Sequence, residues 1–294
     1  MKISRRDFLK WSVAAGVALN IDFDLTNVNT VLAAQTDPPI IWIQGAGCSG
    51  CTISTLNVTN PATIDDVLLN KISMKYNSTI MTASGDLAMQ TLDQSATLYK
   101  GQFILVIEGA IPTGASGNYC IVGEVNGVPL TMQQAVLKYG PMAKYVVAAG
   151  TCASFGGVPA SGANSTGCQS VKTILTGKTT NPIVNLSGYP VHPTVLIQSL
   201  LDLILIGNPA IDNNNRPTKY YGSTVHNTCL RKGTGNAIQI GSATGCFRGL
   251  GCNGPTTNNV CSLMKWNNNQ AWCIGVNYPC IGCANPTFPK NPLL

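Results

Sequence analysis

The chain has 294 residues, and with 45% of them hydrophobic it can bury a large core. Only 10% are charged, against roughly 25% in an average soluble domain, which suggests that a partner covers much of the surface. The formal charge of +6 is modest and excludes a nucleic-acid footprint. No apolar run approaches the roughly 18 residues that span a bilayer, so no transmembrane anchor of the chain's own is predicted.

Residues 1–34 are predicted to be a twin-arginine signal peptide. The segment Ser4–Lys10 reads S-R-R-D-F-L-K, a weakly apolar stretch follows, and Val31–Ala34 supplies small residues for cleavage. A basic N-terminus that contains two arginines by chance is the alternative. The signal predicts a periplasmic or otherwise extracytoplasmic protein that is exported in the folded state.

Beyond the signal, short apolar runs alternate with stretches of helical periodicity as far as residue 207. Strands are predicted at 39–44, 103–107, 145–149 and 182–186, and helical segments at 52–56, 64–69, 130–138 and 194–206. Continuous apolar runs such as Phe103–Ile107 are typical of strands covered on both faces of a parallel sheet. Residues 35–207 are therefore predicted to be an α/β domain with a doubly wound parallel sheet.

Side chains that can bind a metal or transfer a proton follow the carboxyl ends of these predicted strands. They are Cys48, Cys51, Glu108, Cys152 and Tyr189. Open parallel sheets bind their ligands at this edge, so a site is predicted there. Glu108 is expected at the edge that faces a partner, where it could orient the site, pass protons, or be an ordinary loop carboxylate.

Residues 208–294 are predicted to form a second, loop-rich unit. The stretch from His226 to Cys283 holds seven cysteines and one histidine among Gly, Asn and Pro. It has too little apolar material for a core of its own, so whatever the cysteines bind must order it.

Disulfides, zinc and iron–sulfur clusters are the candidates for that role. Twelve cysteines could pair as disulfides in an oxidising compartment, which would make the chain an exported binding protein without clusters. However, the pairs Cys48/Cys51 and Cys280/Cys283 have the spacing that lets two thiolates bind one metal or cluster. Single cysteines lie between the pairs, and the twin-arginine route typically exports proteins already folded around a cofactor. Iron–sulfur clusters are therefore favoured over zinc and disulfides.

Several motifs occur in the order found in one protein family. They are W-I-Q-G-A-G-C-S-G-C at 42–51, E-G-A-I-P at 108–112, G-T-C-A at 150–153, H-x-x-C at 226–229, L-G-C-x-G-P at 250–255 and P-C-I-G-C at 279–283. With this order and spacing, the chain resembles the small subunit of nickel–iron hydrogenases from the signal to the C-terminus.

The resemblance implies a flavodoxin-like domain followed by a loop-rich domain that binds iron–sulfur clusters. It implies three clusters that carry electrons between the nickel–iron site of a separate large subunit and an external acceptor, such as a cytochrome, during hydrogen oxidation. No catalytic residue is expected in this chain, because hydrogen is activated in the large subunit, and the complex could be a dimer of heterodimers. A related electron-transfer subunit of a quinone-linked complex is the alternative, although such relatives lack the export signal.

The resemblance assigns two clusters to the second unit. The distal cluster is expected to take His226, Cys229, Cys246 and Cys252, and the medial cluster Cys261, Cys273, Cys280 and Cys283. Many relatives have proline where this chain has Cys273, and they hold a three-iron medial cluster. Cys273 therefore predicts a 4Fe-4S cluster here, whereas an unbound Cys273 would leave a 3Fe-4S cluster. Asn253 stands where relatives often carry lysine, which puts docking of a familiar electron carrier in doubt.

The proximal cluster departs from the family pattern. Three of its ligands are matched, by Cys48, Cys51 and Cys152. The fourth position is Tyr189, in G-Y-P, where relatives have a cysteine. Cys168, in a loop that the family places near this cluster, is predicted to replace it. The alternatives are Cys120, Tyr189 and His192.

Overall fold

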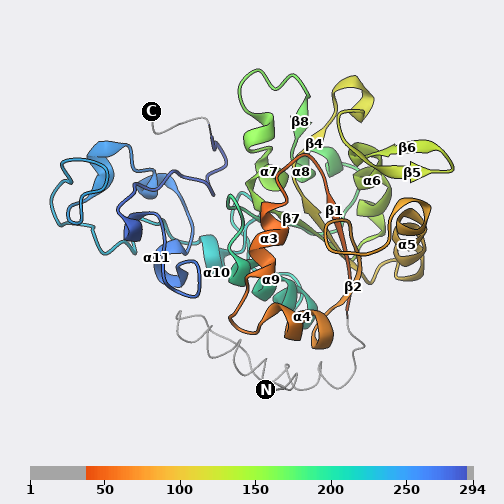
Figure 1. Ribbon diagram of the computed structural model, residues 1–294, viewed down its shortest axis with the longest axis horizontal. Helices are drawn as coiled ribbons and strands as arrows, with labels where there is room; N and C mark the ends of the chain where they lie inside the picture. The colour runs from red at the N-terminus through yellow and green to blue at the C-terminus, as the bar shows by residue number, and fades with distance from the viewer. Residues whose placement is uncertain (1–37, 290–294) are drawn as a thin grey trace.

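The computed structural model describes residues 38–289, and the predicted signal peptide lies outside this range. A five-stranded, all-parallel sheet runs through the first domain (Figure 1). Its strands are β1 (Pro39–Gln44), β2 (Ser73–Asn77), β3 (Ile104–Glu108), β7 (Tyr145–Ala149) and β9 (Ile183–Leu186). Their order across the sheet is β2-β1-β3-β7-β9, the flavodoxin-like order of a doubly wound sheet. The predicted fold class is therefore confirmed.

Helices pack on both faces of the sheet, because successive strand residues point to opposite sides. In β1, Ile40 and Trp42 join one buried cluster, whereas Ile41 and Ile43 join the other. The first cluster is completed by α3 (Gly50–Leu56), α4 (Ile64–Asn70) and α9 (Pro193–Leu205), and the second by α5 (Gly85–Leu98), α6 (Met132–Tyr139) and α8 (Val171–Leu175). Burial on two faces explains why the central strands are continuous apolar runs.

The predicted elements up to residue 207 correspond to β1, β3, β7, β9, α3, α4, α6 and α9. The helix predicted at 130–138 begins later, at Met132. Thr131 and Gln134 form a capping box at its start, and the residues before them pair in a hairpin.

Sequence periodicity does not predict β2, α5 or the hairpin of β5 (Ile121–Val125) and β6 (Val128–Thr131). Strand β2 reads S-M-K-Y-N and lies at the edge of the sheet, so it needs no continuous apolar run. The hairpin turns at Asn126 and Gly127, both with positive φ, at 52° and 76°. The Asn-Gly pair is the sequence signal that identifies such a turn.

Short elements extend the carboxyl edge of the sheet. Strand β4 (Ile111–Pro112) pairs antiparallel with β8 (Cys168–Gln169), and Pro112 lies opposite Cys168. Directly after β7 comes α7 (Gly150–Phe155), and the 3-10 turns η1 (Gly114–Gly117) and η3 (Val158–Ala160) follow β4 and α7. A third 3-10 turn, η2 (Gly140–Met142), precedes β7 and lies at the opposite edge of the sheet. The β4–β8 pairing brings a loop distant in sequence to the edge where the predicted site lies.

Residues 208–289, called here the C-terminal lobe, lie beside the sheet domain (Figure 1). Their helices are all short: α10 (Thr218–Tyr221), α11 (Cys261–Met264), η4 (Phe247–Leu250), η5 (Gly254–Thr256) and η6 (Ile274–Val276). A small apolar cluster that includes Phe247, Trp272 and Ile274 packs with Cys229 and Cys280, so cysteines form part of the lobe's limited core. Within residues 38–289, no helix combines the length and apolar character needed to cross a membrane.

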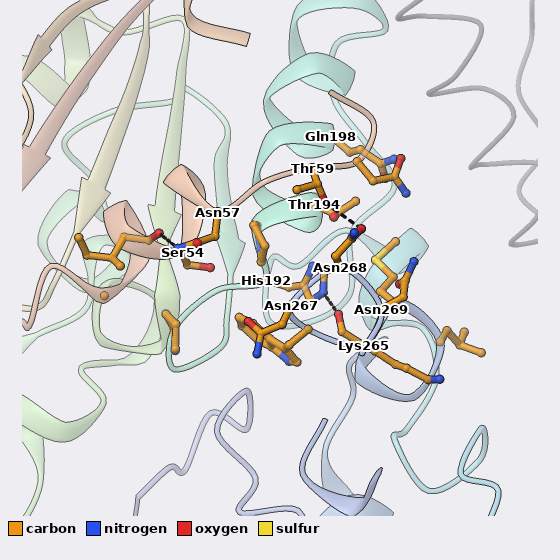
Figure 2. A pocket seen from close by; sticks show the side chains of 18 residues that line it. Ser54, Asn57, Thr59, His192, Thr194, Gln198, Lys265, Asn267, Asn268 and Asn269 are labelled. Atoms are coloured by element: carbon orange, nitrogen blue, oxygen red, sulfur yellow. Dashed lines mark hydrogen bonds between the residues drawn. The ribbon is translucent and has the colours of Figure 1, made fainter. Parts of the chain in front are cut away.

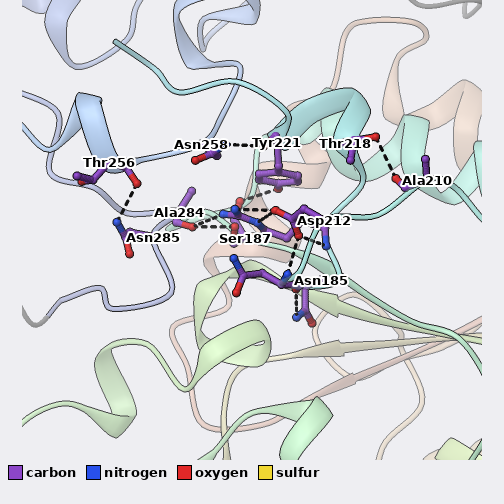
Figure 3. A network of polar contacts seen from close by, with 12 residues as sticks. Asn185, Ser187, Ala210, Asp212, Thr218, Tyr221, Thr256, Asn258, Ala284 and Asn285 are labelled. Atoms are coloured by element: carbon purple, nitrogen blue, oxygen red, sulfur yellow. Dashed lines mark hydrogen bonds and ion pairs between the residues drawn. The ribbon is translucent and has the colours of Figure 1, made fainter. Parts of the chain in front are cut away.

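A buried polar network joins this lobe to the end of β9 (Figure 3). Arg216 pairs with Asp212, at 2.8 Å between Nη2 and Oδ2, and donates to the carbonyl of Ala284 at 3.2 Å. Ser187 Oγ donates to the same carbonyl at 2.9 Å, and the Tyr221 hydroxyl donates to the carbonyl of Ser187 at 2.7 Å. Because Ala284 directly follows the last cysteine, the network holds the end of the cysteine-rich segment against the sheet domain.

Arg216→Leu is expected to lower the free energy of unfolding by about 3–5 kcal/mol, because breaking a buried ion pair leaves the other charge uncompensated. The side chains of Arg216 and Asp212 are 4% and 21% exposed. Lys138→Leu is the control: its ion pair with Asp93 joins side chains that are 47% and 48% exposed, so the loss should be about 0–1 kcal/mol. Denaturant unfolding measures both, and equal losses would contradict the structural role of Arg216.

Candidate metal centres

The first group of thiols lies at the carboxyl edge of the sheet, where the strand order reverses between β1 and β3. Cys48 and Cys51 follow β1, and Cys152 lies in α7 after β7. Cys51 and Cys152 are buried, whereas Cys48 is exposed. The three are close enough for the charge of one to affect the ionisation of another. The fold thus brings together the three thiols predicted to bind the proximal cluster.

Glycines let the backbone pass close to these sulfurs. A Cβ added to Gly150 would lie 2.5 Å from Cys51 Sγ, and one added to Gly157 would lie 3.0 Å from Cys152 Sγ. Gly150 also has a φ of +84°, which residues with a side chain rarely adopt. These positions keep space open beside the thiols, so the loops fit a bulky group held by sulfur.

Glu108, the last residue of β3, is buried at 3% exposure beneath this group. Its carboxylate accepts hydrogen bonds from Trp42 Nε1 at 3.0 Å and from the Cys51 amide at 2.8 Å. The amide of Thr52 donates to it at 3.1 Å, and the Thr52 hydroxyl donates as well. The expected edge carboxylate is therefore not an exposed loop residue, and its contacts are those of a group that orients the first turn of α3.

Two candidates for the fourth proximal ligand lie beside Cys152. Cys168 is buried with Cys152 and Ala110 in one small cluster, and Tyr189 packs against it. Cys168 Sγ is 3.2 Å from the Thr166 hydroxyl. Burial and the nearby thiols, Cys48 first among them, raise the pKa of the Tyr189 hydroxyl. Both side chains are therefore near the group.

The other two candidates are less well placed. Cys120 packs against the core of the sheet domain and has Cys168 as a neighbouring thiol. His192 is turned toward the C-terminal lobe, where its Nε2 contacts the carbonyl of Lys265 and its ring lies 4.8 Å from that of Trp266. Burial lowers the pKa of His192, which favours the neutral imidazole.

A second group, His226, Cys229, Cys246 and Cys252, lies in the C-terminal lobe. Burial is the largest cause that raises the pKa of Cys229, and the nearby thiols of Cys246 and Cys252 raise it further. A Cβ added to Gly254 would lie 3.3 Å from Cys252 Sγ and 3.8 Å from the Cβ of His226, so His226 and Cys252 flank one glycine. The structure thus brings the predicted distal ligands into one part of the lobe.

The third group contains Cys261, Cys273, Cys280 and Cys283. Burial raises the pKa of Cys261 well above its usual range, and the thiols of the other three raise it further. Burial also raises the pKa of Cys280 to about 12 and that of Cys283 to about 11. Cys273 therefore lies with the predicted medial ligands.

Direct contacts connect the three groups in series. Thr151, next to Cys152, donates a hydrogen bond from its hydroxyl to the carbonyl of Cys283. Cys252 Sγ accepts from the amide of Cys280 at 3.4 Å. The order in space is therefore the sheet-edge group, then the group around Cys283, then the group with His226.

The raised pKa values mean that the buried thiols are neutral near pH 7 when no metal is bound. Burial raises the pKa of Cys152 to about 11, and the pKa of Cys51 is raised by burial and then by Glu108. Metals bind the thiolate, so loading such a site releases protons, and the positive charge of the metal offsets the repulsion between the resulting thiolates.

All twelve cysteines are free thiols. In residues 38–289, no three Cys, His, Asp or Glu side chains converge as ligands of a single metal ion.

A cavity of about 590 Å³, which the sequence does not predict, lies between α3, the start of α9, the end of α11 and the loop that follows α11 (Figure 2). Its lining includes His192 and Gln198, whose Nδ1 and Nε2 atoms have no hydrogen-bond partner within residues 38–289. The run 267–269, in sequence a polar Asn loop, lines it too. The cavity forms where segments distant in the chain meet, which no local pattern signals, and no cysteine lines it.

Three family models match the chain. The model described as NADH ubiquinone oxidoreductase, 20 Kd subunit, matches residues 48–203, and the model for the C-terminal part of the NiFe/NiFeSe hydrogenase small subunit matches residues 221–293. A model of the TAT (twin-arginine translocation) pathway signal sequence matches residues 2–20. The predicted signal is therefore confirmed.

Similar proteins align over almost the whole chain. The small subunit of the periplasmic [NiFeSe] hydrogenase of Desulfomicrobium baculatum is 34% identical over 99% of this chain and 98% of its own length. Periplasmic [NiFe] hydrogenase small subunit 1 of Nitratidesulfovibrio vulgaris is 36% identical over 99% of this chain and 92% of its own. The solved structure of the [NiFeSe] hydrogenase from Desulfovibrio vulgaris Hildenborough matches with a TM-score of 0.82 at 37% identity, covering 87% of this chain and 96% of that one.

The fold, the serial thiol groups and the export signal define an exported iron–sulfur protein of electron transfer. The chain belongs to the family of nickel–iron hydrogenase small subunits. It is the electron-transfer partner of the large subunit in that oxidoreductase, binds iron–sulfur clusters, and is exported to the periplasm by the twin-arginine route. The hydrogenase interpretation is thus supported over a disulfide-stabilised binding protein.

Glu108→Gln is expected to loosen the start of α3, because hydrogen bonds to a charged group contribute about 1.5–3 kcal/mol each and an amide offers only one acceptor oxygen. Hydrogen exchange at the amides of Cys51 and Thr52 should accelerate. Glu124→Gln, at an exposed position of β5, is the matched control and should leave these amides unchanged. Equal protection in both variants would contradict the orienting role of Glu108.

Proposed function

We propose that the chain binds three iron–sulfur clusters, each held by one of the three groups of side chains. The proposal divides the chain into a signal peptide at 1–34, a flavodoxin-like domain at 35–207 with the proximal cluster, and a C-terminal domain at 208–294 with the medial and distal clusters. The observation that carries it is the serial contact, from Thr151 to the carbonyl of Cys283 and from the amide of Cys280 to Cys252 Sγ.

For the proximal cluster we propose Cys48, Cys51, Cys152 and Cys168 as ligands. The burial of Cys168 with Cys152 and its pairing opposite Pro112 support this set. A thiolate is also the usual protein ligand of iron–sulfur clusters, whereas a phenol is not. Tyr189 remains the competing ligand, since it packs against the same cluster of residues.

For the medial cluster we propose Cys261, Cys273, Cys280 and Cys283, and therefore a 4Fe-4S cluster. This set is supported by electrostatics: the thiols of Cys283, Cys280 and Cys273 are near enough to raise the pKa of Cys261. Four thiolates match the usual ligand number of a four-iron cluster. We propose 4Fe-4S clusters at the other two sites as well.

For the distal cluster we propose His226, Cys229, Cys246 and Cys252. One imidazole among thiolates removes negative charge, which raises the reduction potential, as histidine does in Rieske centres. The amides of Arg231 and Cys280 donate to the sulfurs of Cys229 and Cys252, each at 3.4 Å. Such hydrogen bonds tune the potential in the same direction, because they stabilise the electron-rich form.

Clusters at these sites would supply one-electron transfer between the nickel–iron site of the large subunit and an external acceptor, such as a cytochrome, during hydrogen oxidation. The chain's own residues supply the ligands, keep Cys51 and Cys152 away from water, and fix the first cysteine loop through Glu108. Three of the four distal residues are only partly buried, whereas Cys51 and Cys152 are buried, which suits the exit side of such a path.

Cys168→Ser is expected to lower the iron content of the purified heterodimer by up to about four atoms and to alter the proximal signal in electron paramagnetic resonance. Cys120→Ser is the matched control, because it removes a neighbouring thiol outside the proposed set, and it should change neither. Unchanged iron in Cys168→Ser together with a loss in Tyr189→Phe would transfer the fourth ligand to Tyr189.

Cys273→Ser is expected to convert the medial cluster from four-iron to three-iron, because one iron loses its protein ligand. The oxidised variant should lose about one iron atom per chain and gain the resonance signal of a 3Fe-4S cluster, and the medial potential should rise. Cys120→Ser again serves as control. Without any new signal, Cys273 would be an unbound thiol.

A further inference from the structure

Charge is distributed very unevenly along this chain. None of its twelve acidic residues follows Asp212, whereas seven of its eighteen Lys and Arg residues do. The preceding part of the chain contains slightly more acidic than basic residues. The net positive charge therefore belongs to the C-terminal part, and the preceding part is nearly neutral.

Part of this positive charge is neutralised where the lobe joins the sheet domain. Arg216 pairs with Asp212, and Lys219 pairs with Asp202 at 2.9 Å. The remaining basic residues of the described lobe, Arg231, Lys232, Arg248 and Lys265, form no ion pair with a carboxylate of residues 38–289. The lobe thus carries positive charge that no carboxylate compensates, from Lys265 near the sheet domain and from Arg231, Lys232 and Arg248 elsewhere.

Three of these cations lie beside the proposed distal ligands. Arg231 donates its amide to Cys229 Sγ at 3.4 Å, Lys232 follows it, and Arg248 comes two residues after Cys246. The side chains of Lys232 and Arg248 are exposed. No acidic residue is available within this part of the chain to offset them.

The guanidinium of Arg231 ties the surrounding loops into one surface. It donates to the carbonyl of Ser242 at 2.8 Å and to Asn277 Oδ1, and it lies 4.7 Å from the centre of the Phe247 ring. The amide of Gly241 donates to the carbonyl of Asn277 at 2.9 Å. Segments near residues 231, 242 and 277 therefore meet here.

Large apolar side chains are exposed on the same loops. Leu230 follows Cys229 directly and is 89% exposed. Ile238 is also 89% exposed, and the amide of Ala237 before it donates to the carbonyl of Cys246 at 2.9 Å. Two exposed aliphatic residues thus adjoin the thiols that are proposed to hold the outermost cluster.

We propose that this surface, formed by Leu230, Lys232, Ile238 and Arg248, docks a small electron-carrier protein whose redox centre is surrounded by acidic side chains. The inference rests on the proposed function, because it needs a distal cluster at Cys229 and Cys246. Weak electron-transfer encounters use small interfaces, and opposite charge on the two partners accelerates their association. The aliphatic pair supplies apolar contact next to the cluster, and the cations select the sign of the partner.

The test compares Lys232→Glu/Arg248→Glu with Lys100→Glu/Lys178→Glu in the purified heterodimer. The control makes the same change in charge at two exposed lysines of the sheet domain, each of which precedes a strand of the sheet and so lies away from its carboxyl edge. Binding of an acidic ferredoxin and of a basic c-type cytochrome is measured by titration with each protein, at low and at physiological salt.

The heterodimer should bind the acidic ferredoxin more tightly than the basic cytochrome, and salt should weaken that binding. Charge reversal on the lobe should weaken binding of the acidic carrier about tenfold or more, whereas the control should change it little. Equal affinity for both carriers, or equal effects of the two double variants, overturns the proposal. Binding to vesicles of anionic phospholipid without a preference for the acidic carrier also overturns it, in favour of a membrane surface.

A separate readout distinguishes failure of the proposed function. The visible absorbance of the clusters should bleach under hydrogen in the heterodimer and in both double variants, with no carrier present. Loss of bleaching in the unsubstituted heterodimer would count against the proposed clusters themselves. Normal bleaching with no selectivity for the acidic carrier would count against the docking surface alone.

Discussion

The buried carboxylate of Glu108 is the interaction on which the sheet-edge site depends. A charge inside the protein is costly unless hydrogen bonds replace its hydration, and Glu108 obtains them from the indole of Trp42, the amide of Cys51 and the backbone and hydroxyl of Thr52. These donors belong to β1 and to the first turn of α3. One side chain thus ties two neighbouring strands to the cysteine loop, so the position of Cys51 follows from the geometry of the sheet.

The C-terminal lobe is organised on a different principle. Its apolar cluster is small and includes cysteines, and its connections to the sheet domain are polar contacts such as Arg216 with the carbonyl of Ala284. In such a segment, ligand bonds to the iron–sulfur clusters that we propose would replace the missing core and couple folding to metal binding. This explains why a loop-rich chain is suited to export by a route that carries folded proteins.

The two units also differ in the burial of their thiols and in the charge of the surface beside them. The sheet domain presents a site enclosed by the sheet edge, with Cys51 and Cys152 buried, whereas the lobe carries exposed cations next to Cys229 and Cys246. In a family whose small subunit works with a large subunit, a chain built in this way separates its contacts. The sheet edge suits contact with the large subunit, and the charged lobe suits the transient electron carrier that we propose.

Local sequence alone determined a large part of this protein. The apolar runs predicted four of the five strands, and the C-x-x-C pairs with their flanking motifs identified the family, because each of these patterns is contained in a few consecutive residues. The edge strand β2 has no continuous apolar run, so its sequence signal is weaker. Only the tertiary structure decided that Glu108 is buried, that β4 brings Cys168 to Cys152, and that Cys252 lies against Cys280. Those contacts join residues far apart in the chain, so they depend on strand pairing and on the packing of the lobe against the sheet, which no local pattern encodes.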